Sequence, residues 1–176
     1  MYVGHVGLAL ALGAHRRAPP LWLLVFAARG CDWGDVVRGV LRIGYGDGGL
    51  SPHSLPLVAA GAALAALLAT TIARRRGAAA GAPALLAAVA YASHWPADYL
   101  TGIKPTWPGG PWVGEMWYSF PGRDLVLEAA VVMYGWWLWR RSLRDPGGPA
   151  PWALLAALLA LQLVADLLMG RGTLLL

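Results

Sequence analysis

Apolar stretches of helical length follow one another along the chain and are separated by short polar segments. A helix needs about 20 apolar residues to cross the roughly 30 Å hydrocarbon layer of a bilayer. Three stretches reach that length, namely Ser54–Ala73, Ala82–Leu100 and Pro151–Gly170. A fourth stretch, Asp124–Trp139, is slightly shorter. The pattern predicts helices that cross a membrane.

Two shorter apolar stretches, Tyr2–Ala14 and Pro20–Cys31, occupy the N-terminal part of the chain. Arg16, Arg17 and Pro19 stand between them, so we expect a tight helical hairpin. In a signal peptide the positive charge precedes the apolar region, whereas here it follows, which predicts a retained first helix. The whole pattern predicts an all-α fold: a polytopic membrane helical bundle of about six helices, the first two short, with an irregular Trp-, Pro- and Gly-rich outer loop. We expect residues 1–176 to form a single integral-membrane domain.

The composition agrees with a membrane protein. Apolar residues make up 58% of the 176 positions and charged residues only 13%, against about 25% in ordinary soluble domains. This excludes an ordinary cytosolic enzyme, a disordered chain and a nucleic-acid-binding module. The net charge of +5 comes from arginines clustered between apolar runs, a pattern typical of membrane topology signals. A single cysteine, Cys31, excludes an internal disulfide and a cysteine zinc cluster.

The arginine clusters predict an orientation. Eight basic residues fall in the three short loops 15–19, 74–81 and 140–150, which lie on one side if the helices alternate in direction. Short cytoplasmic loops are enriched in Lys and Arg, so this side is expected to be cytoplasmic. We therefore expect a multi-pass protein of the cell (inner) membrane with both termini outside.

Ionisable side chains gather at the predicted outer ends of the helices. They include His5, Asp32, Asp35, His53, His94, Asp98, Asp124, Glu128 and Asp166. Acidic residues contribute little to topology, so their one-sidedness is independent of the arginine rule. Ionisable groups at membrane depth are costly and usually line a bundle interior or a water cavity. Imidazole and carboxylate ligands suit zinc, and also iron or manganese, so a divalent metal site is predicted.

Two short motifs carry most of this prediction. In the segment 93–98, His94 and Asp98 are four residues apart and share one helix face, although Pro96 between them is expected to disturb the helix. In the second motif, Ser54 fits a helix N-cap, and His53 before it stands at the positive end of the helix dipole, which favours neutral imidazole. The alternatives are a helix-end histidine, a solvated aspartate and a loop histidine at headgroup level.

The order of the motifs resembles that of the YdjM-type family of membrane-bound, metal-dependent hydrolases. The motifs are Gly4-His5-Val6, Asp32-Trp33-Gly34-Asp35, Pro52-His53-Ser54-Leu55, and Ser93-His94-Trp95-Pro96-Ala97-Asp98 with the Trp-rich loop after Thr101. They cover roughly residues 1–140 in order and spacing. The family's ligand pattern is itself similar to that of zinc-dependent phospholipase C and related zinc nucleases.

The resemblance implies five metal ligands: His5, Asp32, His53, His94 and Asp98. The chain departs from the family pattern in two places. It has Asp32-x-x-Asp35 where the family often has Asp-x-Asp-His, and residues 48–51 stand where the family often has His-Arg-Gly. Because of these departures, the resemblance does not by itself imply a second metal ion or full activity.

A metal at this site would lower the pKa of bound water toward 7 and supply hydroxide for hydrolysis. Asp35 or Glu128 would act as a general base, or as an outer carboxylate that orients a histidine. Further residues on the same side are candidates for substrate binding: Arg38, Arg42, Arg123, Trp107 and Trp112. The alternative roles are arginines that meet lipid headgroups and an aromatic belt at the membrane interface.

Two functions follow from these observations. The first is a membrane-bound, metal-dependent hydrolase that acts at the outer membrane face on a lipid or other phosphoester. The second is a non-catalytic small membrane protein (a degenerate hydrolase, or an assembly or transport component) whose polar cluster is structural. Transport predicts polar residues through the whole bilayer, and the span after Ser54 has none between Leu55 and Ala69.

Overall fold

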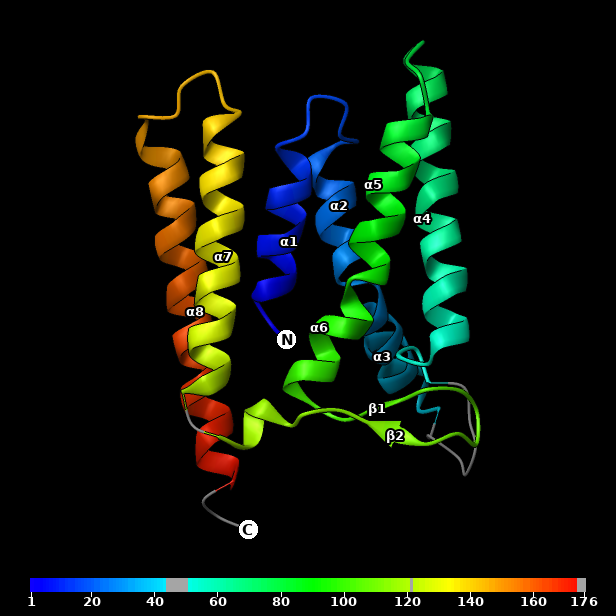
Figure 1. Ribbon diagram of the computed structural model, residues 1–176, viewed down its shortest axis with the longest axis vertical. Coiled ribbons are helices and arrows are strands. Elements are labelled where there is room, and N and C mark those ends of the chain that lie inside the picture. Colours follow the sequence, from blue (N-terminus) through cyan, green and yellow to red (C-terminus); the bar gives the residue numbers. More distant parts are fainter. Residues whose placement is uncertain (44–50, 121, 174–176) are drawn as a thin grey trace.

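The computed structural model describes residues 1–43, 51–120 and 122–173, with side chains described up to residue 168. Six helices run along a common direction (Figure 1): α1 (Gly4–Gly13), α2 (Leu21–Ala28), α4 (Leu55–Arg75), α5 (Gly81–Ala92), α7 (Arg123–Arg141) and α8 (Pro149–Thr173). They pack in the order α8, α7, α1, α2, α5 and α4. The predicted all-α class and N-terminal hairpin are confirmed. Residues 48–50, which bear on one departure from the family pattern, lie outside the described residues.

Two apolar clusters hold this row of helices together. One contains Leu23 and Leu24 of α2 with small residues of α1, α4 and α5, and the other joins Leu10 of α1 to Val132 and Trp136 of α7. The small residues let the helix backbones come close together. The closely packed atoms of neighbouring helices then gain van der Waals attraction.

Helices α1 and α7 meet at two glycines. A Cβ atom on Gly7 would lie 2.7 Å from the backbone oxygen of Val131, and one on Gly135 would overlap the carbonyl oxygen of Gly7. Neither helix has room for a side chain at this crossing. The contact therefore fixes the position of α1, and with it that of His5.

Short elements gather at one end of the row (Figure 1). They are α3 (Gly30–Leu41), α6 (His94–Thr101), β1 (Lys104–Pro105), β2 (Trp112–Val113) and the 3₁₀ turn η1 (Trp117–Ser119). The two strands pair antiparallel, with Lys104 opposite Val113. The loops that carry the arginine clusters lie at the opposite end.

Two expectations are corrected here. The stretch Ala82–Leu100 is not one continuous helix, because α5 ends at Ala92 and α6 begins at His94. Pro96 has no N–H to donate to the carbonyl of Ala92, so the ladder is interrupted there. Asp32 and Asp35, expected at the outer end of the second apolar helix, lie instead in α3, an additional helix of twelve residues.

Two helices of the described residues are long and apolar enough to cross a membrane. They are Leu55–Arg75 and Pro149–Leu168, with mean hydropathies of 2.0 and 1.9. Only 17% of the residues in the apolar part of each helix are buried, so most of its apolar surface faces outward.

Candidate metal centre

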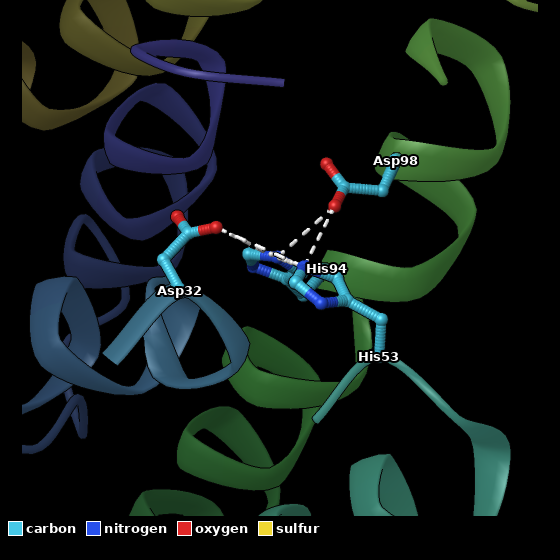
Figure 2. Close-up of side chains that lie close together, drawn as sticks. All are labelled: Asp32, His53, His94 and Asp98. Atoms are coloured by element: carbon cyan, nitrogen blue, oxygen red, sulfur yellow. Dashed lines mark hydrogen bonds and ion pairs between the residues drawn. The ribbon is translucent and has the colours of Figure 1, made fainter. Parts of the chain in front are cut away.

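Four side chains converge where α3, α4 and α6 meet. Asp32 comes from α3, His53 from the residues just before α4, and His94 and Asp98 from α6. Figure 2 shows their polar atoms pointing toward one another. One ligand atom from each residue lies within 4.8 Å of the others, and all but Asp32 are buried.

The shortest separations join His53, His94 and Asp98. The Nε2 atoms of the two histidines are 3.1 Å apart, and Asp98 Oδ2 lies 3.1 Å from His53 Nε2 and 3.2 Å from His94 Nε2. The His94–Asp98 contact confirms the predicted approach of residues four apart on one helix face. Asp32 Oδ1 lies further away, 3.5 Å from His94 Nε2 and 3.8 Å from His53 Nε2.

These distances fit a small metal ion. Ligand atoms 2.0–2.1 Å from a tetrahedral zinc ion are about 3.3 Å apart. The five separations given above, 3.1–3.8 Å, bracket that value. Two imidazoles and two carboxylates are also a donor set that zinc accepts.

Neighbouring groups orient the ligands. His94 donates from Nδ1 to the carbonyl oxygen of Ala28 over 2.8 Å, which leaves Nε2 to face the cluster. Asp35 Oδ2 lies 3.3 Å from His53 Nδ1, and Arg29 Nε lies 2.8 Å from Asp32 Oδ2. Such outer contacts hold the imidazole tautomer and ring orientation that a metal requires.

The second oxygen of Asp98 faces away from the cluster. Asp98 Oδ1 lies 3.2 Å from His5 Nε2 and accepts a hydrogen bond of 2.6 Å from the amine of Met1. The His5 ring stacks on His94 with centroids 3.9 Å apart, and its Nδ1 atom is buried with no hydrogen-bond partner in the described structure. His5 therefore lies behind Asp98 and beside His94, outside the group of four.

The electrostatics of the cluster follow from its hydrogen bonds. Burial alone would raise the pKa of Asp32, but hydrogen bonds from His53 and His94 outweigh it and lower that pKa well below its usual range. Burial would lower the pKa of His53, and the hydrogen bonds to Asp32 and Asp98 raise it instead. The metal-free cluster therefore favours ionised carboxylates and a protonated imidazole.

A cavity of about 210 Å³ opens beside the cluster. Its lining combines cluster residues with a lysine and tyrosines: Met1, Tyr2, Asp32, Asp35, His53, Asp98, Lys104 and Tyr118. Lys104 Nζ lies 2.9 Å from Asp98 Oδ2. Burial and the nearby charge of Glu128 raise the pKa of Tyr118, so its hydroxyl keeps its proton. The cavity thus places the Lys104 ammonium and the Tyr118 hydroxyl next to the candidate ligands.

Glu128 lies in α7, behind the tyrosine side of this cavity. Its carboxylate accepts hydrogen bonds of 2.7–2.9 Å from the backbone N–H groups of Tyr2, Val3 and Gly4, and one of 3.1 Å from the Tyr118 hydroxyl. An anion at this position satisfies unpaired N–H groups at the start of α1 and complements the helix dipole. The observed contacts give Glu128 a structural part in placing α1.

The predicted substrate-binding residues lie outside the residues that line the cavity. Arg123 is exposed and covers the Phe120 ring, 4.2 Å from its centroid, while Trp107 and Trp112 are also exposed. Arg38 and Arg42 lie in or just after α3, where Arg38 donates to the carbonyl oxygen of Ile43. The structure therefore brings four of the five predicted ligands together, with His5 beside them, but not these five substrate-binding candidates.

Sequence reasoning missed three contributors to the centre: Arg29, Thr101 and Lys104. Thr101 accepts a hydrogen bond from the Met1 amine, and Arg29 and Lys104 pair with the two aspartates. Lys104 is the only lysine in the sequence, which would have singled it out. Arg29 precedes Asp32 by three residues, a spacing that brings side chains together on a helix.

Comparison of the chain with protein-family models, with curated proteins and with solved structures finds no match.

Proposed function

We propose that this protein is a polytopic membrane hydrolase that binds a divalent metal, with zinc the best fit, through Asp32, His53, His94 and Asp98. Its substrate in this proposal is a phosphoester, from a membrane lipid or another molecule, reached at the outer membrane face. The observation that carries the proposal is the spacing of the four ligand atoms, which suits a tetrahedral ion.

The membrane part of the proposal rests on exposed apolar surface. Large apolar side chains point outward along the row of helices, including Leu64, Leu67, Leu85, Val126, Leu161 and Leu168. Soluble proteins rarely expose continuous apolar patches of this kind. The arginine-rich loops lie at the end opposite the cluster, and the preference of such loops for the cytoplasm puts the cluster outside.

The chemistry follows from the groups around the cavity. A bound divalent ion would lower the pKa of water toward 7 and so supply a nucleophile at neutral pH. Asp32 is the loosest of the four ligands and lines the cavity, so water and substrate approach from its side. Lys104 offers a positive charge to an anionic oxygen of the substrate, and Asp35 keeps the His53 ring in place.

The test is the metal content of the detergent-purified protein, measured by mass spectrometry. His53→Ala and His94→Ala should lose the metal, whereas His15→Ala, which alters a histidine in the arginine-rich loop, should keep it. Bound zinc, iron or manganese lost in both cluster variants supports the proposal. Hydrolysis of nitrophenyl phosphate esters should disappear in the same two variants. No metal after reconstitution with each ion would overturn it.

A second candidate is a structural polar network without catalysis. One observation favours it: Lys104, Arg29 and the Met1 amine already pair with the two aspartates. In that case the cluster holds α1, α3, α4 and α6 together and needs no ion. The metal measurement distinguishes the two candidates, and a liposome flux that depends on Asp98 would indicate transport instead.

A further inference from the structure

Helix α3 has one face toward the cluster and another that nothing in the described structure covers. Its apolar residues are spaced i, i+3, i+4, i+7 and i+8, which forms a single stripe along a helix. These residues are Trp33, Val36, Val37, Val40 and Leu41, and their exposed fractions range from 45% to 76%. We call them the α3 stripe. Asp32 and Asp35 lie off this stripe, on the side of the metal cluster.

The stripe leaves α3 poorly anchored within the protein. Of its twelve residues, only Cys31 is buried. An isolated helix of this length is marginal in water, because most helical stability comes from burying an apolar face. Yet α3 supplies Asp32 to the cluster and Asp35 to His53. The surroundings that cover the stripe therefore affect the positions of two cluster carboxylates.

The surface next to the stripe indicates what covers it. Trp33 stacks on Phe26 of α2 with ring centroids 5.6 Å apart, and Phe26 and Trp22 are themselves more than half exposed. The stripe thus continues the outer apolar surface of α2. Under the membrane placement proposed above, α2 meets the lipid chains and α3 begins where α2 ends, at the level of the headgroups.

Charge identifies the lipid class. Arg38 lies in α3 and Arg42 directly follows it, whereas Arg29, just before the helix, pairs with Asp32. An apolar stripe with Trp, flanked by arginines, is typical of helices that lie in the membrane interface and prefer anionic lipids. A second copy that covered the stripe by a two-fold contact would bring the same arginines of both chains near one another, whereas anionic headgroups carry the opposite charge.

We propose that α3 is an interfacial helix that lies on an anionic phospholipid bilayer, and that this contact holds Asp32 and Asp35 at the metal centre. The four ligands of the metal site are then in place only when the protein lies on a lipid surface. The centre is therefore active only where a substrate carried by that surface is present. This inference rests on the proposed function, because it takes the metal site as given. Its two parts, lipid contact and coupling to the metal, are tested separately.

The first experiment measures the depth of α3 in the membrane. Val40→Cys is made with Cys31→Ala, labelled with an environment-sensitive dye and placed in vesicles of phosphatidylcholine and phosphatidylglycerol. The vesicles also contain lipids that carry a doxyl quencher at a known depth. Quenching of the dye should be stronger with doxyl groups near the headgroup than with doxyl groups near the ends of the acyl chains. Leu67→Cys, in the middle of α4, should show the reverse order. No quenching by either lipid, as expected for a stripe in water or against a second copy, would overturn the proposal.

The second experiment measures metal affinity with Co²⁺, whose visible absorption reports tetrahedral ligation. Affinity should be about 10-fold weaker in uncharged detergent than in anionic nanodiscs, the loss expected when groups that orient ligands are disturbed. In nanodiscs, Val40→Asp should reproduce the weak value. Gly39→Asp adds the same charge one residue away, where a side chain meets open space, and should keep the strong value.

The outcomes separate this inference from the proposed function. Equal metal affinity in detergent and nanodiscs, or equal effects of the two Asp variants, would overturn the coupling and leave the metal site intact. No metal binding in any medium would overturn the proposed function, while the depth measurement would still decide where α3 lies. Affinity that rises with protein concentration in detergent would indicate a second copy and contradict the lipid contact.

Discussion

His53 Nε2 lies 3.1 Å from Asp98 Oδ2, although His53 precedes α4 in the chain and Asp98 lies in α6, after α5. The Leu55 N–H donates to the carbonyl oxygen of Thr106, directly after β1, and this hydrogen bond ties the start of α4 to the segment that follows α6. His94 approaches the same oxygen from within α6. Asp98 Oδ2 is therefore the atom that most of the cluster shares.

Asp98→Asn should remove metal binding and also destabilise the fold. The variant keeps the shape of the side chain but leaves the Met1 amine and Lys104 without their anion. Removing one partner of a buried ion pair costs about 3–5 kcal/mol, so we expect a clear fall in unfolding temperature in detergent. Asp35→Asn, at the more exposed carboxylate, is the control and should change stability much less. An unchanged unfolding temperature in Asp98→Asn would contradict this assignment.

Arg29→Gln should weaken metal binding without abolishing it. Arg29 contacts Asp32, the outermost ligand, and the loss of such an outer contact typically costs 10–100-fold in metal affinity. Isothermal titration with zinc measures the change. Arg75→Gln removes the same charge in the last turn of α4, at the opposite end of the row, and should leave the affinity unchanged. Equal effects of both variants would mean that overall charge, and not the Asp32 contact, governs binding.

Local spacing predicted the parts of the site that lie within one turn of helix. His94 and Asp98 are four residues apart, and their approach required no knowledge of the fold. The hairpin of α1 and α2 was equally visible, because prolines and arginines interrupt two apolar runs. For His53 and the residues of α6, the sequence predicted only that they lie on the same side of the membrane, and not that they are in contact.

The remaining features depend on tertiary contacts or on weak local signals. The α3 stripe was present in the sequence, but three glycines and two aspartates in the same segment favour a loop over a helix. The carboxylate of Glu128 has backbone N–H groups as partners. Almost every residue type has such a group, so the sequence gives no indication of this contact. Lys104 reaches the centre from β1, and a strand of two residues leaves no recognisable hydropathy pattern.

Glu128→Gln distinguishes a general base from a structural carboxylate. If Glu128 holds α1 as the contacts indicate, the variant should lower the unfolding temperature, because hydrogen bonds to a charged acceptor contribute about 1.5–3 kcal/mol. Zinc content should remain, since Glu128 lies outside the cluster. Loss of phosphoester hydrolysis at an unchanged unfolding temperature would instead show catalysis by Glu128.

Tyr118→Phe is the companion variant to Glu128→Gln. It removes one neutral donor to Glu128 and keeps the backbone donors, so the loss should be about 1 kcal/mol. A larger loss than in Glu128→Gln would contradict the structural role assigned to the carboxylate, because the tyrosine would then contribute more than all the contacts of Glu128.

Acidity should act in opposite directions on the metal-free and the zinc-loaded protein. The pKa of His53 is raised in the metal-free fold, so its ion pairs contribute stability that is complete below about pH 6.5 and is lost as the pH rises through the folded pKa. The pKa of Asp32 is lowered, so this carboxylate stays ionised throughout the same range. Zinc needs the unprotonated imidazole, and its affinity therefore increases as the pH rises.

Thermal unfolding across this pH range, with chelator and with zinc, measures both effects. The chelated protein should lose stability as the pH rises above about 6.5, while the added stability from zinc should grow over the same interval. His53→Asn and His94→Asn each remove a group whose pKa is raised by hydrogen bonds to the aspartates, to about 9 for His94, and each should reduce the slope of the chelated protein. His15→Asn should leave both slopes as they are, because His15 lies in the loop between α1 and α2. A zinc increment that shrinks as the pH rises would mean that the metal does not replace a proton at His53.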